Sequence, residues 1–109
     1  MTIKPFNAQV GTASANSSVI DVTNLPLISS NLALQVVTSG FNTADATITV
    51  KHSLDGINFD TVADSAITLA SGSASQTILM TSRMCDYYRI DFAKGTNSAG
   101  TFTVNLSFN

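Results

Sequence analysis

The chain has 109 residues, a length that favours one domain with a single hydrophobic core. Hydrophobic residues make up 44% of it, which is ordinary for a globular protein and argues against general disorder. Charged residues make up only 11%, against about 25% in a typical soluble domain, and the net charge is −2. All seven acidic residues are aspartate, which favours turns and strand ends over helices. Surface polarity must therefore come mainly from Ser, Thr and Asn.

Nucleic acids and membrane surfaces are not expected partners, because positive charge is sparse and scattered. Binding to phosphates or to anionic lipid needs a basic stripe or patch, and the sequence has neither. No apolar run approaches the roughly 20 residues that span a bilayer. Residues 1–18 have no apolar segment of the secretory-signal kind, so we expect synthesis in a cytoplasm. The single cysteine, Cys85, cannot form an intramolecular disulfide, which fits a reducing compartment.

Residues 1–16 are predicted to form an extended N-terminal arm. They are mostly small and polar, and with Pro5 and Gly11 among them they show no sustained period. Phe6 and Val10 are the apolar residues that we expect to anchor this arm on another surface.

Residues 17–109 are predicted to form the folded domain, since apolar and polar residues alternate there with the period of two that is typical of β-strands. Asp55-Gly56 is a strong hairpin signal, because glycine tolerates positive φ without steric cost. Residues 94–100 are predicted to be a long hairpin loop between the last two strands. The predicted strands span residues 18–23, 32–38, 46–53, 59–62, 66–70, 75–80, 87–92 and 101–108.

Seven to eight short antiparallel strands without a convincing helix define an all-β fold class. We expect a single β-sandwich, either immunoglobulin-like or jelly-roll, in which one face of each sheet closes on the core. The other face of each sheet is expected to be rich in Thr and Ser. The alternation does not give the order of the strands, so both topologies stay open at this point.

No catalytic residue, metal ligand or cofactor is expected, since each chemically reactive residue has a structural explanation. His52 ends a strand on its apolar side, and Cys85 comes just before a core strand, where a free cysteine usually packs as a small apolar residue. Asp55, Asp60 and Asp64 cluster around one hairpin. Such a cluster could supply the two carboxylates of a glycoside hydrolase or the oxygen ligands of a calcium loop. Turn chemistry explains Asp55, and the ligand spacing and terminal Glu of a calcium loop are missing. We therefore expect that the protein is not an enzyme.

Six residues are candidates for contact with a partner. Tyr87 and Arg89 are predicted to face away from the core, and these residue types dominate binding hot spots. Cross-strand packing on a solvated sheet face is the alternative explanation for both. The other candidates come from the arm, from a turn and from the loop at 95–100. They are Phe6, Val10, Phe41 and Asn97.

Three segments carry a resemblance to known β-sandwich proteins: ITVKHSLDGINFDTV at Ile48–Val62, DYYRIDF at Asp86–Phe92 and GTFTVNLSF at Gly100–Phe108. A strand followed by Ser-x-Asp-Gly-x-Asn-aromatic, with a later Tyr-x-Arg-Ile strand, resembles small phage virion proteins of the capsid decoration or auxiliary capsid type. The same hairpin resembles that of discoidin-like carbohydrate- or lipid-binding sandwiches. This chain departs from the latter because it has no tryptophan and only one cysteine.

The resemblance implies a non-enzymatic structural subunit of a phage particle, located in the virion and contacting the major capsid protein or other virion subunits. The low charge is consistent with this role, because hydroxyl and amide groups are buried at an interface at a smaller cost than unpaired charges. A β-domain with few charges is poorly defended against edge-to-edge association, so we also expect a homo-oligomer, with a trimer as one candidate arrangement. The alternative function is a carbohydrate-binding β-sandwich module for host-surface attachment, with a glycan as its partner.

Overall fold

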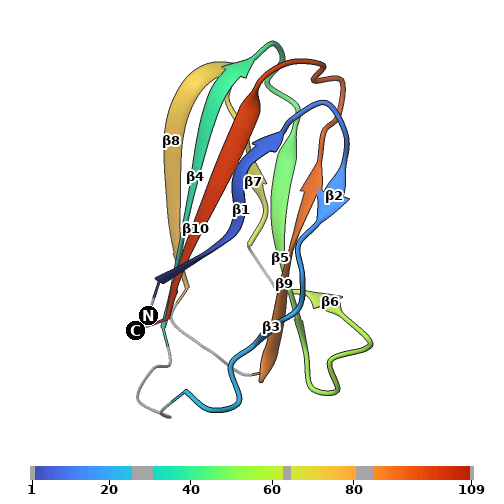
Figure 1. The fold of residues 1–109 in the computed structure, drawn as a ribbon, viewed down its shortest axis with the longest axis vertical. Coiled ribbons are helices and arrows are strands. Elements are labelled where there is room, and N and C mark those ends of the chain that lie inside the picture. The colour runs from blue at the N-terminus through green and yellow to red at the C-terminus, as the bar shows by residue number, and fades with distance from the viewer. Residues whose placement is uncertain (1, 26–30, 63–64, 81–84, 109) are drawn as a thin grey trace.

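The computed structural model describes residues 2–25, 31–62, 65–80 and 85–108. The regular structure within these residues consists of ten β-strands in two antiparallel sheets, which pack face to face as a β-sandwich (Figure 1). The predicted all-β sandwich is therefore confirmed. Over this described part of the chain, no helix is long and apolar enough to cross a membrane.

Sheet A, as we call the four-stranded sheet, has the strand order β1, β10, β4, β8. These strands are β1 (Thr2–Val10), β10 (Thr101–Phe108), β4 (Leu32–Phe41) and β8 (Gly72–Met80). All eight residues of β10 pair with β4 without a register shift. The pair β10–β4 is therefore the regular centre of this sheet, and β1 and β8 are its two edges.

Sheet B is built around two paired strands, β9 (Tyr87–Ala93) and β5 (Thr47–Ser53). Two-residue strands flank each of them. β2 (Ala15–Asn16) and β3 (Ile20–Asp21) pair with β9, whereas β6 (Asp60–Thr61) and β7 (Ile67–Thr68) pair with β5. Both sides of sheet B are therefore bordered by interrupted strands in the part of the chain that is described.

The segment predicted as an extended arm, residues 1–16, is instead part of the sandwich from Thr2 onward. β1 pairs with β10 at the edge of sheet A, and β2 pairs with β9 in sheet B. The chain crosses from one sheet to the other between these two strands (Figure 1). The pairing of β1 is irregular, with register shifts before and after Phe6, and it contains Pro5. These irregularities break the strict alternation by which a strand is recognised in a sequence.

The connection at residues 94–100, predicted as a hairpin loop, instead crosses from one sheet to the other. β9 lies in sheet B and β10 lies in sheet A, and the two strands do not pair. Alternation identifies both strands correctly, but it carries no information about which strands become neighbours. The crossing places the inward faces of β9 and β10 opposite each other across the core.

Four phenylalanine rings fill the space between the sheets at one end of the sandwich. Phe102 of β10 stacks on Phe92 of β9 with ring centroids 4.1 Å apart. Phe6 and Phe41 approach Phe102 at centroid distances of 5.0 Å and 6.3 Å. All four side chains are at most 5% exposed. Since the rings come from three strands of sheet A and one of sheet B, their contacts hold the two sheets together.

Asn97 joins three chain segments at the same end of the molecule. Its Nδ2 donates hydrogen bonds to the carbonyl oxygens of Gly11 at 2.7 Å and Ala99 at 2.8 Å, and its Oδ1 accepts one from the Asn42 N–H at 3.0 Å. A Cβ atom at position 11 would lie 2.7 Å from the Phe41 ring and 3.0 Å from the Asn97 amide, so glycine is required there. Asn97 is fully buried, and its side-chain amide forms hydrogen bonds with backbone groups of the same chain.

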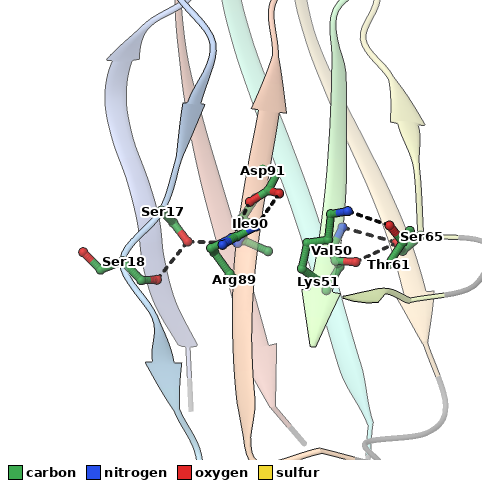
Figure 2. Close-up of polar contacts among 9 residues, drawn as sticks. All are labelled: Ser17, Ser18, Val50, Lys51, Thr61, Ser65, Arg89, Ile90 and Asp91. Atoms are coloured by element: carbon green, nitrogen blue, oxygen red, sulfur yellow. Dashed lines mark hydrogen bonds and ion pairs between the residues drawn. The ribbon is translucent and has the colours of Figure 1, made fainter. Parts of the chain in front are cut away.

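Two buried serines supply hydrogen bonds where the flanking strands of sheet B are interrupted (Figure 2). Between β2 and β3, the Ser17 Oγ accepts a hydrogen bond from the Ile90 N–H at 2.9 Å. Between β6 and β7, the Ser65 hydroxyl accepts from the Val50 N–H and donates to the Val50 carbonyl, both at 3.2 Å. Because buried backbone groups without partners are costly, these hydroxyls allow β9 and β5 to lie beside incomplete strands.

We predict that Asn97→Ala lowers the free energy of unfolding by at least about 2 kcal/mol, since it leaves buried backbone groups without partners. The matched control is Asn7→Ala at an exposed position of β1, which should change it by less than about 0.5 kcal/mol. Urea unfolding of the three proteins at neutral pH measures both values. Equal changes in the two variants would show that Asn97 does not hold these segments.

Candidate functional site

The outer face of sheet B carries charged and aromatic side chains. Alternation along β9 places Tyr87, Arg89 and Asp91 on this face, and Lys51 of β5 lies directly opposite Arg89 in register. Like charges facing each other across two strands are unfavourable. Asp91 offsets this repulsion, because it accepts hydrogen bonds from the Arg89 Nε at 2.7 Å and from the second guanidinium nitrogen, Nη2, at 3.0 Å (Figure 2).

The two cations of this face have further partners within the chain. The Arg89 guanidinium lies over the Phe59 ring, 4.8 Å from its centroid, as in a cation–π contact. The Lys51 Nζ donates a hydrogen bond to the Thr61 hydroxyl of β6 at 2.7 Å. The charges on sheet B are therefore largely satisfied by neighbouring side chains of the same chain.

Tyr87 lies beside the hairpin that joins β5 to β6. A Cβ atom built on Gly56 would lie 3.3 Å from two ring carbons of Tyr87, and Gly56 has a φ of +75°. Glycine therefore allows the turn to approach the tyrosine ring closely. As a result Tyr87 is half-buried, and the structure brings it together with Arg89 on one face as the sequence predicted.

The tip of the same hairpin presents two apolar side chains on a rigid turn. Leu54 is 75% exposed and Ile57 is 81% exposed. Between them, Asp55 Oδ1 accepts hydrogen bonds from the Ser53 hydroxyl and from the N–H groups of Ile57 and Asn58, at 2.7 to 2.9 Å. These bonds hold the pKa of the Asp55 carboxyl well below its usual range, and the bond from the Asn58 N–H has the largest effect. Asp55 is thus a turn residue.

The pH dependence of stability tests this role of Asp55. Its folded-state pKa is lowered, so its stabilisation is present above the unfolded-state pKa near 4 and is lost as the pH falls towards the folded-state value. The difference in urea midpoint between the native chain and Asp55→Asn should therefore be constant above about pH 5 and shrink below about pH 4. A difference that stays constant down to pH 2 would contradict the assignment.

The outer face of sheet A has the opposite character. Three adjacent strands contribute only hydroxyl, amide and apolar side chains to it. Its residues are Ala33, Gln35, Val37 and Ser39 of β4, Thr101, Thr103, Asn105 and Ser107 of β10, and Ser73, Ser75, Thr77 and Leu79 of β8. Val37 at the centre is 38% exposed and Leu79 is 76% exposed. Over these three strands the face has no charged side chain, whereas sheet B carries Lys51, Arg89 and Asp91.

Three of the six predicted contact residues are not on the surface. Phe6 and Phe41 are 5% and 3% exposed and belong to the aromatic core, and Asn97 is fully buried. The prediction that these three residues contact a partner is corrected. They lie in the N-terminal segment, at the end of β4 and in the 94–100 connection, all of which fold onto the core. Val10 at the end of β1 is 52% exposed. It lies in sheet A and is therefore not on the same face as Tyr87 and Arg89.

Cys85 and His52, the two residues considered as a nucleophile and its base, are both partly buried. Cys85 is half-buried, and burial, followed by the charges of Asp86 and Asp60, raises the pKa of its thiol. This disfavours the thiolate that a nucleophile requires. His52 is half-buried on β5 and lies opposite Asp60 in register. No cluster of three His, Cys, Asp or Glu residues that could hold a metal ion occurs among the described residues, and Asp64 lies outside them.

The fold has counterparts among solved structures. The PBSX exported protein XepA matches the whole of this chain with a TM-score of 0.71 and 17% identity, and the chain spans 37% of the length of XepA. The N-terminal cellulose-binding domain of β-1,4-glucanase C from Cellulomonas fimi matches 96% of this chain and 72% of its own length, with a TM-score of 0.50 and 18% identity. No protein-family model and no curated protein matches the chain. At these identities the similarities show a shared β-sandwich fold alone.

Proposed function

We propose that this chain is a non-enzymatic structural subunit of a phage particle, which decorates the capsid by docking on the major capsid protein through the outer face of sheet A. The observation that carries the proposal is the charge-free surface of β4, β10 and β8. The charged side chains lie on sheet B, so the outer face of sheet A is a broad surface that a partner can cover without burying a charge.

The chemistry of the sheet A face suits an interface. Burying an unpaired charge costs several kcal/mol, whereas a hydroxyl or amide exchanges its water for a direct or water-mediated hydrogen bond at modest cost. Gln35 already bonds on both sides within the face, donating to the Ser75 hydroxyl and accepting from the Asn105 amide, each at 3.1 Å. These bonds order the side chains before any partner arrives, which reduces the entropy lost on binding.

The similarity to XepA supports the phage origin in this proposal. XepA is an exported protein of the phage PBSX, and its match extends over every part of this chain. The chain corresponds to only part of XepA, so the comparison supports a domain type and not the activity of the whole protein.

Quantitative mass spectrometry of gradient-purified particles from the source culture tests the proposal. A structural subunit is expected at a fixed, high copy ratio to the main shell protein. Absence from the particles, together with abundance in the lysate, would contradict the proposal.

A charge placed on sheet A should weaken docking. Val37→Lys puts a cation at the centre of the face, and we expect at least a tenfold loss of binding to particles that lack this chain, since an unpaired charge is buried. Thr49→Lys is the matched control on sheet B, where Asp91 lies opposite in register. Co-sedimentation of each purified variant with such particles measures the bound copies. Equal binding by Val37→Lys and the native chain would exclude this face.

Carbohydrate binding is the second candidate function, and the gathering of Tyr87, Arg89 and Phe59 on sheet B favours it. Aromatic rings beside charged groups are typical of sugar-binding surfaces, although here the Arg89 guanidinium already occupies the Phe59 ring. A glycan array tests this function directly. Saturable binding that is lost in Tyr87→Ala and kept in Val37→Lys would support it over capsid docking.

A further inference from the structure

The outer edge of β8 is long, regular and without a neighbouring strand in the described structure. β8 has nine residues, and its one strand partner is β4, so its other side forms the border of sheet A (Figure 1). From Thr38 opposite Ala74 to Leu32 opposite Met80 the ladder has no register shift. The strand sequence, GSASQTILM, contains no charged residue and no proline. Such an edge is a template for pairing with another strand.

The other borders of the two sheets are protected in ways that β8 is not. β1, at the opposite edge of sheet A, contains Lys4 and Pro5 and has two register shifts, all of which hinder the addition of a strand. Sheet B is bordered by two-residue strands where it is described. β8 is therefore the one long, unprotected edge among the described strands.

Gln76 holds β8 in place from the core side. Its amide accepts a hydrogen bond from the Ala70 N–H and donates one to the Thr68 carbonyl, both at 3.0 Å. The segment before β8 thus fastens the strand to the opposite sheet. The same attachment orders β8 in each copy before they meet, which reduces the entropy lost when two copies pair.

We propose that β8 pairs antiparallel with β8 of a second copy of this chain about a two-fold axis, which joins two four-stranded sheets into one of eight strands. A two-fold axis lets one strand be its own partner, so a single surface suffices. The absence of charge on β8 favours this occupant, because a charged edge would face its own charge across the axis. Each chain carries a net charge of −2, and the pairing keeps that charge away from the contact.

A register centred on Gln76 shows what the pairing would bury. Ser75 would lie opposite Thr77 of the second copy, and Ser73 would lie opposite Leu79. Leu79 is 76% exposed in the single chain, so the contact would cover its side chain. The two uncharged faces of sheet A would also become continuous. This arrangement is a dimer, unlike the trimer considered from the sequence, and it does not depend on the proposed role in a particle.

Sedimentation velocity over a wide range of protein concentration tests the pairing with three proteins. The native chain should shift from monomer to dimer as its concentration rises. Thr77→Lys places like charges on both sides of the axis and should raise the dimer dissociation constant at least tenfold. Asn7→Lys makes the same change at an exposed position of the protected edge β1 and should behave as the native chain does.

A native chain that stays monomeric up to millimolar concentration would overturn the proposal. So would an equal effect of Thr77→Lys and Asn7→Lys, because the contact would then not depend on β8. If Thr77→Lys does not fold, Leu79→Lys replaces it, since Leu79 is exposed on the same side of β8. These outcomes are independent of capsid docking, which Val37→Lys tests on the face of the sheet and not on its edge.

Discussion

The stacking of Phe102 on Phe92 across the two sheets is the contact on which the rest of this fold depends. It requires β9 and β10, which follow each other in the chain, to lie in different sheets with their inward residues opposed. Because side chains alternate along a strand, fixing these residues inward fixes their neighbours outward. The aromatic core therefore determines which hydroxyl, amide and charged groups reach the surface.

The consequence of this alternation is a molecule with two different outer faces. On sheet B, Arg89, Asp91 and Lys51 find partners within the chain, and this face is largely satisfied without a ligand. On sheet A, β4, β10 and β8 expose groups that can be buried without leaving a charge unpaired. The uncharged surface positions are thus gathered on the outer face of sheet A. In the proposed function, this placement lets the low charge favour association.

The sequence predicted the strands better than their arrangement. All eight predicted segments correspond to strands. The alternation is clearest in β9 and β10, where every second residue is apolar and buried. β1 was missed since Pro5 and its register shifts interrupt the alternation, although Phe6 is in the core. Asn97 lies outside the strands, where burial depends on contacts distant in sequence, and Phe41 lies beyond the predicted end of its strand at residue 38, whereas β4 continues to Phe41. The charge-free face requires the strand order, which no local pattern contains.

In the proposed function, the outer face of sheet A is a contact surface of the assembled particle. Hydroxyl-radical footprinting of the free and the particle-bound chain, read by mass spectrometry, tests it residue by residue. We predict that Val37 of sheet A loses labelling on assembly, whereas Tyr87 of sheet B keeps it. Loss of labelling at Tyr87 with Val37 unchanged would contradict this proposal and would place the contact on sheet B.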